Sequence, residues 1–286
     1  NCERHCPTDA IKVTPGVMPG YVPPCGTACP AGTDVQGYIA LAGAGRYEDA
    51  YRLIRQSNPF PSVCGRICNH PCQAACNRND LDESVGIRDI KRFVADKAFE
   101  NGMPVVEKKR KSNGKKIAVI GAGPSGLSCA YYLQLSGYSV EVFESESVAG
   151  GVLAYGIPEY RLPKAVLNRD IQAIEATGVQ IHLNTTVGED VSFDELYKKF
   201  HAVYVSTGTQ LSRKANIPGE DMPGVYHGLD FLKAVNLGKP VEIGKKVAVI
   251  GGGNTAIDAA RTARRLGAEV TIVYRRQRND MPCEER

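Results

Sequence analysis

Two segments of the 286-residue chain follow one plan, and this repetition constrains the fold more than any other feature. "KKIAVIG" at 115–121 leads into "AGPSGLSCAYYLQLSG" and "YSVEVFES". "KKVAVIG" at 245–251 leads into "GGNTAIDAARTARRLG" and "EVTIVYRR". Each segment is typical of a buried strand, a glycine-rich turn, a helix and a second strand. The repetition predicts an α/β fold with two Rossmann-like nucleotide-binding domains.

The first turn carries the dinucleotide fingerprint G-x-G-x-x-G at Gly121, Gly123 and Gly126. These glycines allow a tight turn, close approach of the backbone to a pyrophosphate, and close packing of the helix on the strand. The helix N-terminus then offers N–H groups to the phosphate. Glu144 ends the second strand, where an acid can bind ribose hydroxyls, although it could also be a surface acid. This pattern suits the ADP half of FAD.

The second turn reads G-x-G-x-x-A at Gly251, Gly253 and Ala256, and its second strand ends at Arg275 and Arg276 without an acid. A carboxylate would repel a ribose 2′-phosphate, whereas a guanidinium group pairs with it. The second site is therefore predicted to bind NADPH rather than NADH, unless the two arginines are only surface residues.

Two dinucleotide sites in one chain favour hydride transfer between a nicotinamide and a flavin. Such transfer needs no side-chain acid or base, so no catalytic side chain is predicted. Neither fingerprint is followed by a C-x-x-C pair, and Cys129 within the first helix is interpreted as a buried core thiol. A dithiol–disulfide oxidoreductase is therefore not expected. Electrons are expected to leave the flavin singly, through iron–sulfur centres.

Eight of the ten cysteines lie in the first 76 residues. In "VCGRICNHPCQAAC" at 63–76 they recur at every fourth position, and an unbroken helix would spread them over roughly 18 Å. Pro71 disfavours a helical conformation at His70, so the run is predicted to bend. Some thiols could then converge on one centre while at least one is left out. Without signs of an oxidising compartment, this clustering indicates iron–sulfur ligands rather than disulfides.

The first residues contain C-x3-C-P, with Cys2, Cys6 and Pro7. This is the second half of the bacterial ferredoxin cysteine run. Cys2 and Cys6 are therefore predicted to ligate ferredoxin-type clusters, and the chain is interpreted as a piece of a longer polypeptide. The alternative is two incidental cysteines near a terminus.

Helical patterns fill the segment between the first cysteines and the first fingerprint. Residues 34–57 predict two short helices with Asp34 as N-cap, and residues 84–100 predict an amphipathic helix. The expected division is a ferredoxin tail at 1–16, a helical [4Fe–4S] domain at 17–102, a linker at 103–116, an FAD-binding domain at 117–222 and an NADPH-binding domain at 223–286.

The bulk composition excludes some classes of function. The net charge of +4 and the hydrophobic content of 43% are typical of a soluble globular protein and do not favour a nucleic-acid or membrane-surface binder. No apolar run is long enough to span a membrane, and the start does not resemble a signal peptide. We therefore expect a cytoplasmic protein that neither binds nucleic acid nor inserts into a membrane.

Together, "PPCGTACP", "NPFPSVCGRIC", "GGVLAYGIPEYRLPK", "VSTGT" and "VYRRQRNDMP" resemble the glutamate synthase small-subunit family. That family includes the flavoprotein subunits of electron-bifurcating ferredoxin:NADP oxidoreductases and the flavin half of dihydropyrimidine dehydrogenase. The resemblance covers about 22–286. It implies a helical [4Fe–4S] domain, then an FAD domain into which the NADPH domain is inserted. The family continues past the position of Arg286, so both nucleotide domains are expected to be incomplete.

The resemblance also implies a ligand set. It places Cys29, Cys68, Cys72 and Cys76 around one [4Fe–4S] cluster. Cys64 stands outside, and Cys25 has no clear task because the preceding "MPGYVPP" lacks the cysteine pair of a second cluster. Either of these two could still replace a ligand. The expected FAD contacts are Gly121, Ala122, Gly123, Ser125, Gly126, Glu144, Gly150, Gly151, Arg161, Val187, Thr207 and Gly208. The expected NADPH contacts are Gly251, Gly253, Asn254, Thr255, Ala256, Arg275 and Arg276.

The resulting hypothesis is an NADPH oxidoreductase module. It would move electrons between NADPH, FAD, a [4Fe–4S] cluster and a ferredoxin-type domain or subunit, in either direction, within a complex that could be electron-bifurcating. Arg161 could sit near the flavin ring and tune it, or form only a surface salt bridge. The rival hypotheses are the small subunit of glutamate synthase, which delivers electrons to a separate large subunit, and a non-catalytic scaffold or electron conduit.

Overall fold

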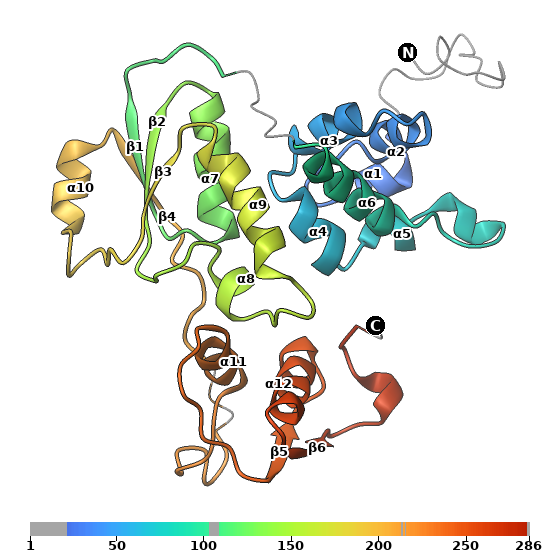
Figure 1. Ribbon diagram of the computed structural model, residues 1–286, viewed down its shortest axis with the longest axis vertical. Helices are drawn as coiled ribbons and strands as arrows, with labels where there is room; N and C mark the ends of the chain where they lie inside the picture. Colours follow the sequence, from blue (N-terminus) through green and yellow to red (C-terminus); the bar gives the residue numbers. More distant parts are fainter. Residues whose placement is uncertain (1–21, 103–108, 213, 215, 285–286) are drawn as a thin grey trace.

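The computed structural model describes residues 22–102, 109–212, 214 and 216–284, and it has three parts (Figure 1). A helical part is followed by a parallel four-stranded sheet with its helices, and then by a smaller strand–helix–strand part. The predicted α/β class is confirmed. Cys2 and Cys6 lie outside the described residues.

The helical part is built on the predicted elements. Asp34 accepts a hydrogen bond from the Gly37 N–H at 2.8 Å, as expected of an N-cap. Tyr38, Ile54 and Val94 are fully buried at its centre. Its elements are α1 (Pro24–Thr27), α2 (Val35–Gly43), α3 (Tyr47–Arg55), α4 (Pro61–Ile67), α5 (Pro71–Ala74), the 3-10 helix η2 (Asn77–Asp80) and α6 (Ile87–Glu100).

The cysteine run bends where the proline predicts. Helix α4 ends at Ile67, and α5 begins at Pro71. Between them His70 adopts a left-handed conformation with φ of 42°. The four cysteines therefore do not share one helix face, because the backbone reverses between Cys68 and Cys72.

The second part holds the first repeated segment. Its strands are β1 (Lys116–Ile120), β2 (Ser139–Phe143), β3 (Gln180–His182) and β4 (Ala202–Val205), all parallel in the order β3-β2-β1-β4. Its helices are α7 (Pro124–Leu135), α8 (Val152–Tyr155), α9 (Lys164–Glu175) and α10 (Phe193–Lys199). Helices α7 and α9 cover one face of the sheet and α10 lies on the other (Figure 1).

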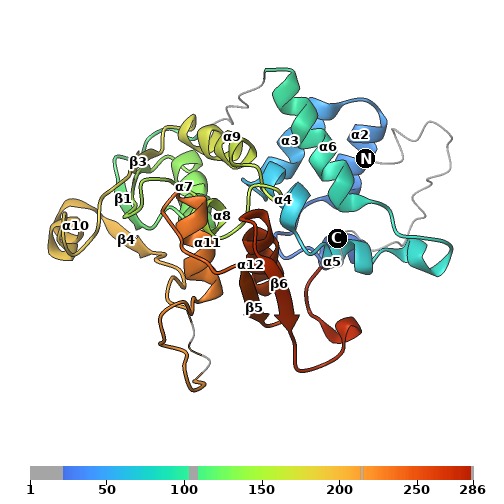
Figure 2. The same ribbon diagram turned by 60° about the horizontal axis from the view of Figure 1, so that its bottom comes forward.

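The helical part and the sheet part share a core. Phe60 and Val63 at the start of α4 pack in the same buried cluster as Leu127 of α7 and Leu167 of α9. Helices α4 and α9 accordingly lie side by side in both views (Figures 1 and 2). The iron–sulfur and flavin parts predicted from sequence are thus packed together through apolar side chains.

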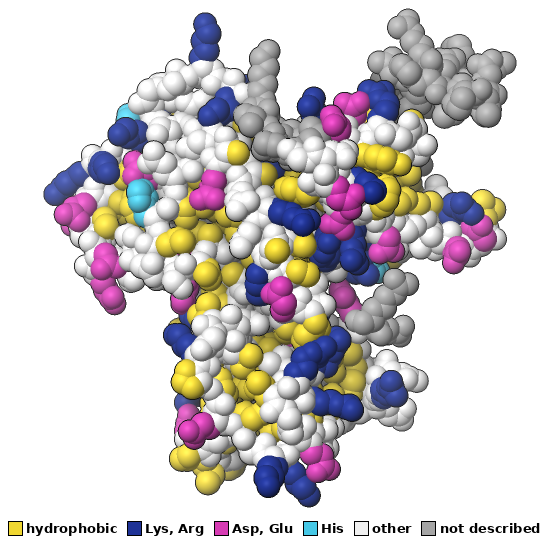
Figure 3. All heavy atoms as spheres, viewed as in Figure 1, with side chains coloured by type: hydrophobic (Ala, Val, Ile, Leu, Met, Phe, Trp, Pro, Cys, Tyr) yellow, Lys and Arg dark blue, Asp and Glu magenta, His cyan; other side chains and the backbone are white. Residues whose placement is uncertain are grey.

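The third part contains α11 (Gly228–Asn236), β5 (Lys246–Ile250), α12 (Asn254–Arg265), β6 (Glu269–Val273) and the 3-10 helix η3 (Arg278–Asp280). Strands β5 and β6 pair in parallel, as the second repeated segment predicts. Phe231, Leu232 and Ala259 are buried between α11 and α12. Hydrophobic side chains also reach the surface of this part, among them Ile250, which is 71% exposed (Figure 3).

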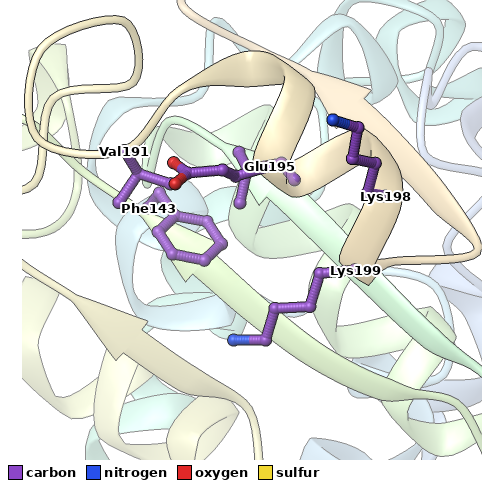
Figure 4. A pocket seen from close by; sticks show the side chains of 6 residues that line it. Phe143, Val191, Glu195, Lys198 and Lys199 are labelled. Atoms are coloured by element: carbon purple, nitrogen blue, oxygen red, sulfur yellow. The ribbon is translucent and has the colours of Figure 1, made fainter.

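A shallow hollow of about 520 Å³ lies on the α10 face of the sheet (Figure 4). It is lined by Phe143, Val191, Glu195, Leu196, Lys198 and Lys199. This face is opposite α7 and α9, and none of the expected FAD contacts lines the hollow. No helix of the described residues is long and apolar enough to cross a membrane.

Candidate functional site

The first glycine turn needs glycine for its own packing at two positions. Gly121 has φ of +99°, and a Cβ atom there would lie 2.5 Å from the Ser206 carbonyl oxygen. A Cβ at Gly126 would lie 2.0 Å from the Gly121 carbonyl oxygen. These contacts explain how α7 packs so closely on β1, as the fingerprint predicts.

Gly123 is different, because a Cβ built there meets no described atom within 4 Å. The space beside this residue is open, as a pyrophosphate close to the backbone requires. Gly123 also precedes α7, and no described side chain caps the first turn of that helix. The N–H groups of that first turn are therefore left without a side-chain cap beside open space, and the site fits an anionic dinucleotide.

Glu144 lies at the edge of this turn. Its side chain is buried, and its carboxylate accepts hydrogen bonds from the Ala122 N–H at 2.7 Å and the Glu146 N–H at 2.9 Å. These bonds hold the carboxylate beside the fingerprint, where a ribose would follow the pyrophosphate. Sequence alone did not indicate this second role in fixing the turn. The predicted ribose contact stays a prediction.

Gly150 and Gly151 lie against the same turn. The Gly150 N–H donates to the Ala122 carbonyl at 2.8 Å. A Cβ at Gly151 would lie 2.9 Å from the Cα of Gly123. Both have positive φ, of 115° and 56°, so only glycine fits both the conformation and the space. The structure therefore brings the fingerprint, Glu144 and this glycine pair together.

The remaining expected FAD contacts are more dispersed. Thr207 and Gly208 follow β4, which pairs with β1, and both are exposed. The hydroxyl of Ser125 lies 3.0 Å from that of Tyr204 in β4. Val187 packs on the α10 face of the sheet with Phe143. Their predicted contacts to FAD stay predictions.

Arg161 connects two parts of the molecule. Its Nη1 atom donates to the Asp258 Oδ2 atom of α12 at 2.7 Å, and its Nη2 atom lies 3.5 Å from the Glu284 carboxylate. The hydroxyl of Tyr160 donates to the Asp258 Oδ1 atom at 3.2 Å. The Arg161 side chain is only 17% exposed. This is a largely buried ion pair between the flavin and NADPH parts, and the predicted contact of Arg161 with the flavin stays a prediction.

The second glycine turn repeats the first. Gly251 has φ of +137°, and Gly253 again has no described atom within 4 Å of a Cβ built on it. A Cβ built at Gly251 would lie 3.2 Å from the Cβ of Ala256, so the turn packs closely against the start of α12. The space at Gly253 fits a second pyrophosphate.

The flanking residues of this turn are placed as follows. The Asn254 Oδ1 atom accepts a hydrogen bond from the Glu284 N–H at 3.0 Å. The side chain of Thr255 faces Gly228, where a Cβ would lie 3.3 Å from its methyl group. Arg275 and Arg276 follow β6 and are exposed, and their predicted role at a 2′-phosphate stays a prediction.

The cysteines of the predicted cluster surround a buried patch of the helical part. Cys72 is buried, whereas Cys29, Cys68 and Cys76 are partly buried, and all are free thiols. Burial raises the pKa of the Cys72 thiol, and the nearby thiols of Cys68 and Cys29 raise it further. The pKa of Cys29 is lowered, because hydrogen bonds from Thr33 and Ala31 and the charge of Lys91 outweigh its burial.

These thiols are not arranged for a single metal ion. Within the described ranges, no three His, Cys, Asp or Glu side chains are close enough to hold one ion. A [4Fe–4S] cluster has a different requirement, since each of its four irons takes one thiolate. The donor set of four cysteines fits that group.

Lys91 was missed from the sequence. Its side chain is 8% exposed, its ammonium lies 5.7 Å from the centre of the Tyr38 ring, and its charge acts on three thiols. The sequence did indicate that Lys91 is buried, because it follows Ile87 by four residues and precedes Val94 by three on the apolar face of α6. A buried cation there offsets the negative charge of bound thiolates.

Cys64 and Cys25 have different surroundings. Cys64 packs against the core shared with the flavin part, its Sγ atom lies 3.7 Å from the Asn58 Oδ1 atom, and burial raises its pKa. This position supports the expectation that Cys64 stands outside the cluster. Burial also raises the pKa of Cys25, which lies near Cys76, so its role stays open.

Two family models match the chain. "Dihydropyrimidine dehydrogenase domain II, 4Fe-4S cluster" matches residues 18–103, and "Pyridine nucleotide-disulphide oxidoreductase" matches residues 115–285. Among solved structures, Mycobacterium tuberculosis FprA in complex with NADPH has a TM-score of 0.50 and 27% identity, covering 61% of this chain and 46% of that chain. The predicted order of an iron–sulfur module followed by nucleotide-binding folds is confirmed.

Curated relatives match nearly the whole chain. Identity is 44% with NADPH-Fe(3+) oxidoreductase subunit beta of Geobacter sulfurreducens, covering 92% of this chain and 40% of that protein. It is 45% with NADP(+)-dependent formate dehydrogenase subunit beta of Moorella thermoacetica, covering 93% and 41%. It is 39% with the glutamate synthase [NADPH] small chain of Escherichia coli, covering 92% and 59%.

The chain therefore spans between two fifths and three fifths of the length of these relatives. The resemblance to glutamate synthase small subunits is confirmed by the last of them and by the iron–sulfur match. Because the nucleotide-binding match covers more than half of the chain, the protein belongs to the pyridine nucleotide-disulphide oxidoreductase family.

Proposed function

We propose that this chain is an NADPH-dependent flavin and iron–sulfur oxidoreductase module that exchanges electrons with a ferredoxin-type partner. The observation that carries the proposal is the presence, in one chain, of two glycine turns with open space at Gly123 and Gly253 and a four-cysteine donor set. Relatives named as NADPH-Fe(3+) oxidoreductase and NADP(+)-dependent formate dehydrogenase subunits support it.

The chemistry of the proposed reaction comes from the cofactors. When bound, NADPH and FAD exchange a hydride, and a [4Fe–4S] cluster exchanges single electrons. The protein has to bind and orient them. The N–H groups at the starts of α7 and α12 would bind the pyrophosphates, Glu144 would orient a ribose, and Arg275 and Arg276 would pair with the 2′-phosphate.

The cluster site has its own requirements. Cys29, Cys68, Cys72 and Cys76 supply the thiolates, and Lys91 offsets part of their negative charge. The Arg88 guanidinium donates to the Cys68 carbonyl at 2.9 Å, and the His70 N–H lies 3.3 Å from the Cys68 Sγ atom. Hydrogen bonds near the sulfurs are one of the ways in which a protein sets a cluster potential.

One experiment tests the proposal directly. The protein is purified anaerobically, its FAD, iron and acid-labile sulfide are counted, and NADPH or NADH is added while the flavin absorption is followed. We expect four irons at the site of Cys29, Cys68, Cys72 and Cys76, weak retention of FAD because the flavin domain is expected to be incomplete, and faster bleaching of added FAD with NADPH than with NADH. Absence of bleaching with both nucleotides would show a non-catalytic conduit instead.

The small subunit of glutamate synthase remains the second candidate, favoured by the 39% identity with the Escherichia coli small chain. The two candidates differ in the acceptor. A ferredoxin-type acceptor should be reduced by this protein alone with NADPH if the first is right. Electron delivery that requires a separate glutamine-using large subunit would favour the second.

A further inference from the structure

Helix α4 is held at its start by a side chain from the flavin part. Its own N-cap residue, Phe60, makes no side-chain capping bond to a described group. Instead, the Val63 N–H donates to the Asp170 Oδ2 atom of α9 at 3.0 Å. Asp170 is fully buried, with an exposed fraction of 0%. One buried carboxylate therefore joins the two helices across the shared core.

Helix α4 leads directly to the predicted cluster. Cys68 follows its last residue. The Nη2 atom of Arg66, in its last turn, donates to both carboxylate oxygens of Asp96 in α6, at 2.8 and 2.9 Å. Arg88 of α6 holds the Cys68 carbonyl. A shift of α4 relative to the flavin part would therefore move a cluster ligand.

Helix α9 leads to the predicted flavin site. A Cβ at Gly150 would lie 2.9 Å from the Leu167 side chain and 3.5 Å from that of Ile171, both in α9. Gly150 is in turn hydrogen-bonded to the fingerprint turn at Ala122. Asp170 stands next to Ile171 in the chain, so α9 supports the flavin turn and carries the anchor of α4.

A charged residue from the helical part completes this contact. Arg55 is fully buried, its Nη2 atom donates to the Ala173 carbonyl of α9 at 3.3 Å, and its guanidinium lies 4.9 Å from the Tyr131 ring centre. Burial raises the pKa of Asp170 to about 7, while its hydrogen bonds and the Arg55 charge act against the rise. Buried charges stabilise little in net terms, and their best-attested use is to fix one register.

We propose that Asp170 is a positioning residue that fixes α4 against α9 and thereby sets the separation between the flavin turn and the cluster ligand Cys68. The inference rests on the proposed function. The step concerned moves one electron from the reduced flavin to the oxidised cluster, and Asp170 neither gains nor loses an electron or a proton in it. Electron transfer slows steeply with separation, so a small displacement of α4 has a large effect on its rate.

The test compares Asp170→Ala and Asp170→Asn in the anaerobically purified holoprotein, with Ser192→Ala as control. Ser192 caps the exposed helix α10, so its loss removes a comparable hydrogen bond far from this contact. We expect the Val63 N–H of the alanine variant to exchange with deuterium at least about tenfold faster. Cluster reduction, followed by freeze-quench electron paramagnetic resonance, should slow at least about tenfold. Flavin reduction by NADPH and iron content should match wild type.

The asparagine variant and the control separate the possible outcomes. Asparagine keeps an acceptor for the Val63 N–H, so this variant should show the wild-type rates of Val63 deuterium exchange and of cluster reduction. Ser192→Ala should change neither rate. If the alanine variant keeps its iron and reduces its cluster at the wild-type rate, the proposal is wrong. Loss of iron from this variant would also overturn it, because Asp170 would then act in cluster assembly. If the alanine variant is insoluble, Asp170→Val, which fills the volume without an acceptor, takes its place with the same expectations. Failure of NADPH to bleach the wild-type flavin would instead contradict the proposed function.

Discussion

At the scale of single residues, the sequence predicts groups whose neighbours are close in the chain and misses those whose partners are distant. Asp34 and the fingerprint glycines act on residues a few positions away, and the structure places them as expected. Asp170 bonds an N–H that is 107 positions away. A backbone N–H has no sequence signature, so nothing in "LNRDIQ" marks this carboxylate as buried. Two predictions belong to this scale.

Lys91 should raise the reduction potential of the cluster, because its buried charge favours the more negative, reduced form. Replacing it with the apolar methionine is expected to lower the potential by on the order of 100 mV, the Coulomb effect of one charge at short range. A potentiometric titration monitored by electron paramagnetic resonance measures the shift. Lys97→Met, on the exposed side of the same helix, is the control. Equal potentials in wild type and Lys91→Met would contradict the assigned role.

Asp170 should make folding stability depend on pH. Its folded pKa of about 7 lies above the ordinary value of 3.8, so the folded state holds the proton more tightly. Its contribution is therefore largest at low pH and is lost as pH rises from about 4 to about 7, by up to about 4 kcal/mol. Urea unfolding of wild type and Asp170→Asn across this range should show the variant gaining relative stability with pH. A constant difference between them would contradict the burial effect.

At the scale of elements, the repeated segments and the proline break are predictable because each depends on local pattern. The parallel pairs β1–β2 and β5–β6 and the bend before Pro71 are confirmed. Helix α6 begins at Ile87 rather than at 84. Helix α9 was not predicted, because the motif quoted for its resemblance ends at Lys164, where this helix begins. Its importance comes from packing against α4, which periodicity cannot reveal.

Alanine substitution should lower folding stability at one glycine of the first turn and FAD affinity at another. At Gly126 the new Cβ would lie 2.0 Å from a carbonyl oxygen, so the fold should lose roughly 2–4 kcal/mol of stability. At Gly123 it meets no described atom, so stability should hold while FAD affinity falls at least about tenfold. Denaturant unfolding and flavin titration distinguish the two variants. Unchanged flavin affinity in Gly123→Ala would place the pyrophosphate elsewhere.

At the scale of the whole molecule, three parts meet through charged groups that no local pattern brings together. Asp258 in α12 pairs with Arg161, Glu284 lies 3.5 Å from Arg161 and 4.0 Å from Arg88, and Arg261 stacks on Tyr160 at 4.2 Å. The fingerprint predicts α12, but not which of its side chains faces the flavin part. These groups join the third part to the flavin part, together with the Lys233–Glu146 ion pair from α11.

Breaking this pair should loosen the third part without unfolding it. Asp258→Ala leaves the largely buried Arg161 guanidinium with only the more distant Glu284 as partner, and removal of one member of a buried pair is costly. We expect the connecting segment before α11 to be cleaved several-fold faster in limited proteolysis, and NADPH-dependent flavin reduction to slow, while FAD content holds. Asp49→Asn is the control, because its pair with Arg46 is exposed, lies outside the cleaved segment and should contribute almost nothing. If Asp258→Ala resisted proteolysis as well as that control, the third part would be held by its other contacts with the flavin part, among them the Lys233–Glu146 ion pair and the Asn236 bond to the Tyr155 carbonyl.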